Sequence, residues 1–172
     1  MKEKTKNTLI RNLILIACFA IIFVLLATQF KFRDQNLAFR KHDDLFDASM
    51  KPISELVSAD RTVKIHLDGG NFTIEDGPEG YDLSADTELC GCLSQLEEIG
   101  ICQINAYYFE AKSDYDLPSC EVWYSLGEGK RIIYTEKGRL ANDTDLMSDT
   151  GAGIKGKEVA VHWLSAVSVE KK

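Results

Sequence analysis

The longest run of hydrophobic positions lies near the N-terminus, where residues 12–30 contain no charged side chain. A helix of that length extends about 28 Å, close to the roughly 30 Å hydrocarbon core of a bilayer. Arg11 and Lys31 close the run on its two sides. The pattern predicts a transmembrane anchor over 12–30, which attaches the chain to a membrane and follows a basic tail at 1–11.

Two other interpretations of this region stay open. A cleaved signal peptide has an apolar segment of about 7–15 residues, shorter than this run, and residues 27–30 offer no small-x-small cleavage site. Residues 15–18, Leu-Ile-Ala-Cys, resemble the lipobox of bacterial lipoproteins. Uncharged residues continue after Cys18, however, where that family has a polar linker.

Residues 8–10, Thr-Leu-Ile, precede the apolar run and resemble the start of mature type IV pilins and pseudopilins. The pattern of that family is Gly-Phe-Thr-Leu-Ile-Glu, and Lys6, Asn7 and Arg11 stand in place of its Gly, Phe and Glu. The resemblance implies an apolar helix, a helical extension and a C-terminal sheet, with processing of the chain before Asn7. A pilin-like or pseudopilin-like subunit is therefore one alternative function.

The orientation of the anchor depends on more than its flanking charges. Four Lys or Arg residues precede the run and four follow it within 31–41, so the positive-inside rule gives a tie. A short basic head before a first apolar helix usually stays in the cytoplasm. The C-terminal domain also holds four cysteines, which suit an oxidising compartment. We therefore expect a cytoplasmic N-terminus and an extracytoplasmic domain over 59–172.

Helical periodicity returns after the anchor. Apolar and small residues recur at helical spacing, which predicts a helical connector over 31–58 that lays this stripe on a sheet: Leu45, Phe46, Ser49, Ile53, Leu56 and Val57. Pro52 predicts either a kink or a new helical start near Ser49. A second helix is predicted over 85–99, with Ser84 as N-cap, Gly100 as terminator and one apolar stripe: Leu89, Cys92, Leu93, Leu96 and Ile99.

Alternating apolar and polar positions predict strands in the rest of the domain. A hairpin is expected over 63–74, around the turn sequence Asp-Gly-Gly-Asn at 68–71. Later elements are strands near 102–108, 120–126 and 131–136, a polar loop over 138–156 and one last strand over 157–169. This order predicts the α+β class: an N-terminal transmembrane helix followed by a small domain with a mainly antiparallel sheet and two helices packed on it.

Four cysteines of the domain are disulfide candidates: Cys90, Cys92, Cys102 and Cys120. A helix that ends at Gly100 and is followed by an antiparallel strand brings Cys92 toward Cys102, so we expect these two to be bridged or buried together. Cys90 lies on the flank of the same helix. A Cys-x-Cys spacing is not the Cys-x₂₋₄-Cys pair of a zinc site, and no metal site is predicted. A thiol-disulfide redox centre at Cys90 and Cys92 is a second alternative function.

Charge is distributed unevenly along the chain. The whole chain is −7 and residues 1–30 are +3, so residues 31–172 carry −10. An acidic domain argues against nucleic acid as a partner. His42, His66 and His162 have no metal-ligand spacing, and no catalytic constellation is found in the sequence. Residues 151–156, Gly-Ala-Gly-Ile-Lys-Gly, match the GxGxxG pattern, but they follow a polar loop and precede a predicted strand, so no cofactor is predicted. We therefore expect a binding module of an envelope assembly, not an enzyme, whose partners are the membrane through residues 12–30 and another envelope protein.

Overall fold

A computed structural model of the chain describes residues 12–24, 26, 32–57, 62–109, 119–136 and 153–169. The chain forms two compact units, Met1–Asp34 and Gln35–Lys172. Residues 12–24 are helical, whereas residues 25 and 27–30 of the predicted anchor lie outside the described residues. No helix within the described part of the chain is both long and apolar enough to cross a bilayer. The transmembrane helix therefore stays a prediction.

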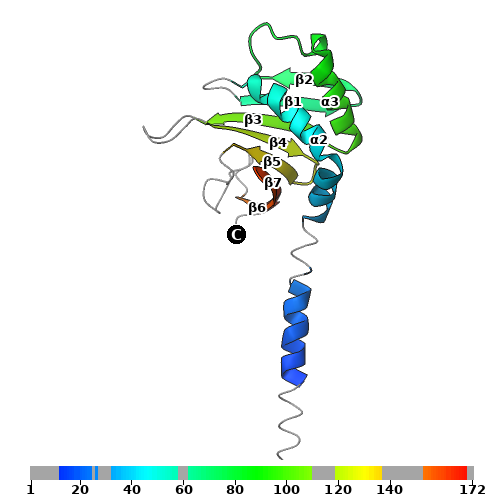
Figure 1. The fold of residues 1–172 in the computed structure, drawn as a ribbon, viewed down its shortest axis with the longest axis vertical. Helices are drawn as coiled ribbons and strands as arrows, with labels where there is room; N and C mark the ends of the chain where they lie inside the picture. The colour runs from blue at the N-terminus through cyan, green and yellow to red at the C-terminus, as the bar shows by residue number, and fades with distance from the viewer. Residues whose placement is uncertain are drawn as a thin grey trace, which may run out of the picture. The chain divides into compact units, whose positions relative to one another are not determined.

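The second unit is built on a sheet of seven described strands, in which every pairing is antiparallel. Their order in space is β2-β1-β3-β4-β5-β7-β6, and helices α2 and α3 cover one face (Figure 1). The bounds are α2 Arg33–Glu55, β1 Thr62–Asp68, β2 Asn71–Glu75, α3 Thr87–Glu98, β3 Gln103–Phe109, β4 Ser119–Ser125, β5 Lys130–Thr135, β6 Gly153–Ala160 and β7 Trp163–Val169. This architecture confirms the predicted α+β class.

The predicted hairpin is present and is tied to α3. Asp68 pairs with Asn71, so Gly69 and Gly70 form a two-residue loop with φ of 59° and 83°. Positive φ at both positions is the conformation of a type I′ turn, which glycine adopts without steric cost. The Glu97 carboxylate accepts both loop N–H groups, at 2.6 Å from Gly69 and 3.0 Å from Gly70. The last turn of α3 thus holds the tip of the hairpin.

Helix α2 lies within the predicted helical connector and bends at a residue that was not predicted. Its one non-helical residue is His42, with φ of −139° and ψ of 27°, and the helix continues through Ser49 and Pro52. The predicted break near Ser49 and Pro52 is therefore wrong. The Ser49 hydroxyl is buried, donates to Phe46 O at 3.0 Å and so does not cap a new helix. Pro52 lies in the last turn, where a missing N–H disturbs little of the helix.

The start of α3 differs from the prediction by two residues. Asp86, not Ser84, is the N-cap, because Asp86 Oδ1 accepts the Leu89 N–H at 2.9 Å. Ser84 lies in a preceding 3₁₀ turn, η1 (Leu83–Ala85), where its N–H donates to Asp82 Oδ1. The other end is as predicted, since Gly100 follows the helix with φ of 93°. Of the predicted apolar stripe, Leu89, Leu93 and Leu96 are buried.

The C-terminal strand predicted over 157–169 is two strands. β6 and β7 form a hairpin whose turn is Val161-His162, and β6 also contains residues 153–156 of the predicted polar loop. Residues 138–152 of that loop lie outside the described residues. His162 has φ of 67°, its carbonyl accepts the Thr135 N–H at 2.9 Å, and its Nδ1 lies 3.0 Å from Thr135 O. The turn has no Gly, Asn or Pro, so the sequence carries no turn signal there.

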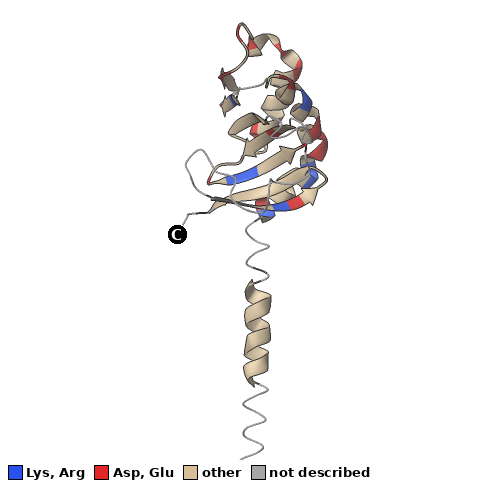
Figure 2. Ribbon diagram, turned by 90° about the vertical axis from the view of Figure 1, so that its left-hand side faces the viewer, with Lys and Arg blue, Asp and Glu red and all other residues tan. Residues whose placement is uncertain are grey.

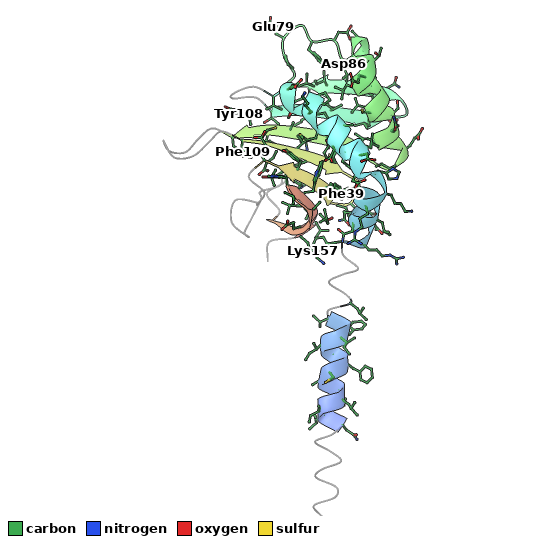
Figure 3. All side chains as sticks on the ribbon, viewed as in Figure 1. Phe39, Glu79, Asp86, Tyr108, Phe109 and Lys157 are labelled. Atoms are coloured by element: carbon green, nitrogen blue, oxygen red, sulfur yellow. The ribbon has the colours of Figure 1, made fainter. Side chains whose placement is uncertain are left out.

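The core between helices and sheet is organised around Trp163. Its ring centroid lies 5.1 Å from that of Phe39 and 5.8 Å from that of Phe46, both on α2. Figure 3 labels Phe39 on this helix. The Trp163 ring also lies 5.9 Å from the Tyr124 ring of β4 and 5.3 Å from the Tyr134 ring of β5. The indole Nε1 donates to Asp47 Oδ1 at 3.0 Å. One side chain of β7 therefore joins α2 to β4 and β5.

We predict that Trp163→Ala lowers the free energy of unfolding by about 3–5 kcal/mol, the usual cost of deleting a large buried aromatic side chain. Urea unfolding followed by circular dichroism measures the change. Val161→Ala, in the adjacent turn, is the matched control, because Val161 is 73% exposed and its truncation should cost within about 0.5 kcal/mol. Equal effects of the two substitutions would contradict the central position of Trp163.

Candidate interaction surface

The helix over residues 12–24 exposes apolar side chains around its whole circumference. The exposed fractions of its large apolar side chains lie between 50%, at Leu15, and 73%, at Phe23. These side chains are Leu13, Ile14, Leu15, Ile16, Phe19, Ile21, Ile22, Phe23 and Val24, and Leu26 follows them. Residues 13–16 alone point to all sides, since successive residues of a helix are about 100° apart. A soluble surface helix buries one apolar stripe and keeps a polar face, and this helix has no such division.

The sheet face opposite α2 and α3 carries a second hydrophobic cluster. Trp123, Ile133, Leu164 and Ala166 are buried there, and Tyr107 packs against them. We name this surface the Trp123 face and include Glu121 and Arg131, which share it by strand alternation. The sequence analysis predicted a strand near 120–126 but not a second buried face, because a carboxylate such as Glu121 between apolar neighbours is typical of a solvent-exposed position.

Trp123 is the centre of the polar contacts on this face. Its Nε1 donates to Glu121 Oε2 at 3.0 Å, its ring meets Tyr107 edge-on with centroids 4.9 Å apart, and the Arg131 guanidinium carbon lies 5.4 Å from its centroid. Glu121 is only 6% exposed. Burial raises the pKa of the Glu121 carboxyl, and the Trp123 hydrogen bond opposes that rise in part. The face thus holds a buried carboxyl group that keeps its proton to a higher pH than an exposed glutamate does.

Several other acidic side chains accept backbone hydrogen bonds at chain turns and ends. Asp86 caps α3, Asp82 accepts the Ser84 N–H, and Glu97 holds the hairpin tip. Glu136 Oε2 accepts the Cys120 N–H at 2.8 Å at the start of β4. Part of the acidity of the domain therefore serves the fold, and solubility alone does not account for it. Among the described residues, no group of three or more His, Cys, Asp or Glu side chains could hold a metal ion.

The structure corrects the predicted disulfide. All five cysteines are free thiols, and the Cys92 and Cys102 side chains are not buried together. Cys102 is exposed at the end of the sheet, where its N–H donates to Ser125 O, its carbonyl accepts the Leu67 N–H, and its Sγ lies 3.4 Å from Ser125 O. These contacts place Cys102 between the ends of β1 and β4. Cys92 is half-buried on α3, whose core contacts come from leucines.

The remaining domain thiols favour the protonated form. Burial, followed by Asp86, raises the pKa of Cys90, whose Sγ donates to Leu83 O at 3.2 Å. Burial, followed by Glu88, raises the pKa of Cys92. Cys120 is buried in the core cluster, and this burial raises its pKa to about 12. A nucleophilic cysteine needs a lowered pKa, and all three of these environments act in the opposite direction.

Strand β2 forms one edge of the sheet. Phe72 and Ile74 are half-buried against the core, while Asn71, Thr73 and Glu75 are exposed on the opposite face. His66 of β1 lies beside this strand, with Nε2 3.5 Å from Glu75 Oε1. The sequence predicted the strand, but its place at the edge follows from strand order, which hydrophobic pattern alone does not reveal.

The buried carboxyl of the Trp123 face generates a pH-dependent prediction. Because folding raises the pKa of Glu121 above its ordinary value of 4.5, the folded protein holds this proton more tightly than the unfolded chain. This stabilising contribution is present below pH 4.5 and is lost as pH rises through the folded pKa. Glu121→Gln keeps an acceptor for Trp123 and removes the ionisation. As the pH rises from 4.5 through the folded pKa, this variant should therefore become more stable relative to wild type, by about 1.4 kcal/mol per unit of pKa difference.

Urea unfolding of both proteins at a series of pH values measures this effect. Glu128→Gln is the control, because that side chain is 88% exposed and its removal should give no comparable gain. A stability difference between Glu121→Gln and wild type that stays constant with pH would show that Glu121 does not titrate as its burial requires.

Comparisons with known proteins do not assign the chain to a family. No protein-family model, no curated protein and no solved structure matches it. The function is therefore argued from three features of the described residues: the apolar helix near the N-terminus, the acidic groups and protonated thiols of the domain, and the open edge of the sheet at β2.

Proposed function

We propose that the chain is a single-pass, membrane-anchored binding module, whose α+β domain lies outside the cytoplasm and engages another envelope protein. The observation that carries the proposal is the exposed apolar circumference of the helix over residues 12–24. Removing the nine large apolar side chains of this helix from water is strongly favourable, at about 25 cal/mol for each Å² buried. Lipid offers that burial on all sides of one helix, which a groove on a protein does not.

The charges on the two sides of residues 12–30 support the same topology. The short segment before them is basic, and the domain after them is acidic. A basic head is retained on the cytoplasmic side, while an acidic domain does not bind an anionic membrane surface. The domain cysteines are free thiols, so they give no support to an oxidising compartment, and the proposed topology is argued from the charges alone.

Binding is favoured over thiol redox chemistry by the state of the sulfur atoms. A redox pair at Cys90 and Cys92 needs an accessible thiolate, whereas burial and nearby carboxylates raise both pKa values. Cys90 also donates its S–H to Leu83 O, an interaction available only to the protonated thiol. The sulfur of Cys90 therefore links α3 to the preceding turn.

One observation favours the pilin-like alternative. Helix α2 follows the apolar segment in sequence and packs on an antiparallel sheet, the plan implied by the resemblance at residues 8–10. In that case the mature chain would begin at Asn7, and the apolar helix would serve subunit packing as well as membrane retention. The mass of the N-terminal peptide distinguishes this alternative from an unprocessed anchor.

We predict that the chain, expressed in bacterial cells, fractionates with membranes and stays there through high-salt and alkaline washes, because burial of residues 12–30 in lipid is independent of charge. Protease added to intact spheroplasts should digest the domain, and mass spectrometry should recover an N-terminal peptide that starts at Met1. A cytoplasmic marker protein and a variant with Phe19→Lys and Ile22→Lys, which places two charges within the span, are the controls.

A soluble form that lacks residues 1–30 would contradict the uncleaved anchor. A domain that resists protease until the membrane is permeabilised would contradict the orientation. An N-terminus at Asn7 would instead support the pilin-like alternative.

A further inference from the structure

The backbone of β2 has unpaired hydrogen-bonding groups along its outer side. In a two-residue hairpin the residues that flank the loop form a bonded pair, so Asp68 and Asn71 bond to each other, as do the alternate pairs beyond them. The N–H and C=O groups of Phe72 and Ile74 therefore point away from β1. Among the described residues, no backbone group bonds to them. The edge offers two donors and two acceptors to an added strand.

The side chains of β2 continue the two faces of the sheet. Phe72 and Ile74 lie on the helix-covered side and pack against the core, still half-buried. The chain then leaves β2 through Asp76, with φ of 58°, and a Cβ on Gly77 would lie 2.8 Å from Ile74 Cδ1, so this segment passes close to the helix-covered side. An added strand with apolar residues on that side and polar residues on the other would bury more of Phe72 and Ile74.

The region around this edge is acidic. Lys64 of β1, opposite Glu75 in register, is the basic residue beside this edge. Residues 65–109 contain no Lys or Arg, while their acidic residues number nine: Asp68, Glu75, Asp76, Glu79, Asp82, Asp86, Glu88, Glu97 and Glu98. Figure 2 shows Asp and Glu along the loop that follows β2 and in α3. Glu75 lies in the strand and Asp76 directly after it, both exposed. Such a field attracts a cationic partner and repels a second acidic copy of the same chain.

The opposite edge of the sheet differs in ways that discourage pairing. β6 contains Lys157, and its pairing with β7 has an irregularity between Glu158 and Ala160. Lysines and bulges are common protections of edge strands against association. β2 has no lysine, no proline and no register shift in its pairing with β1. The two edges are therefore not equivalent, and only β2 combines a regular backbone with complementary charge for a basic strand.

We infer that the edge of β2 binds an extended, Lys- or Arg-bearing segment of a partner protein, which adds as an eighth strand of the sheet. Backbone bonds to Phe72 and Ile74 give the pairing, alternate apolar residues of the segment cover those side chains, and its basic residues face Glu75 and Asp76. The inference rests on the proposed binding function and names its surface. If the peptide does not bind, the evidence for the membrane anchor is unchanged. If the chain does not fractionate with membranes, the result of the peptide titration is unchanged.

The test uses the full chain in non-ionic detergent and a synthetic peptide of alternating Lys and Val residues. Fluorescence anisotropy should show binding that weakens as salt rises, and amide NMR signals of residues 71–76 should shift. Replacing both Glu75→Gln and Asp76→Asn should weaken binding at least about fivefold, since each removes one favourable charge of up to about 1 kcal/mol. Glu55→Gln with Glu128→Gln removes the same charge from exposed sites elsewhere and should change affinity less than about twofold.

Two further peptides separate strand pairing from simple attraction. N-methylation of the valine amides, which removes the backbone donors, should abolish the shifts at residues 71–76 while the charge is unchanged. A peptide of alternating Glu and Val should not bind. Equal binding of the methylated peptide, or equal losses in the two double variants, would overturn the inference. Concentration-dependent dimerisation of the chain alone that Thr73→Lys abolishes would assign the edge to a second copy instead, and would overturn it too.

Discussion

The packing of Trp163 between α2 and the sheet is the interaction on which the domain depends. β7 and α2 are far apart in sequence, yet Trp163 contacts two aromatic rings of α2 and also the rings of Tyr124 and Tyr134. Its indole N–H bonds to Asp47, and the Ser49 hydroxyl lies 3.0 Å from Tyr124 OH within the same core. Offset and edge-on ring pairs contribute about 0.5–1.5 kcal/mol each beyond the burial of area. Helix α2 is therefore part of the domain, and the division between the two compact units falls at its start.

Carboxylates provide a second constraint, at the end of the sheet that holds β1, β2 and α3. Glu97 holds the hairpin tip and Asp86 caps α3, so two acidic groups are already used by the fold. Other acidic groups, Glu75 and Asp76 among them, remain exposed beside an open strand edge. The acidic composition that argues against nucleic acid as a partner is also the basis of the inferred pairing of this edge with a basic segment. A sheet edge with a strong charge is less prone to self-association than a neutral one.

The sequence predicts the parts of this structure that depend on local patterns. The alternation and Gly-Gly turn of residues 63–74 indicate a hairpin, and the leucines of 85–99 indicate a helix with one buried face, because these signals act over a few residues. The β6–β7 turn was not predictable from local pattern, since it is bonded to Thr135 of another strand. The His42 bend has no Pro or Gly as a local signal, and it lies between Phe39 and Phe46, which both pack on the distant Trp163. Features of the candidate interaction surface were not predictable from local pattern either. The edge position of β2, the burial of Glu121 and the exposure of Cys102 follow from strand order, which local pattern does not contain.

The central claim is that α2 belongs to the folded domain, which places the start of the domain near Gln35 and not after residue 58. Urea unfolding of two fragments, 32–172 and 59–172, tests it most directly. The account predicts one cooperative transition for 32–172, and for 59–172 either no transition or a loss of several kcal/mol, because Trp163, Tyr124 and Ile132 would lose their cover. Equal stability of the two fragments would contradict the claim and would make α2 a connector outside the domain.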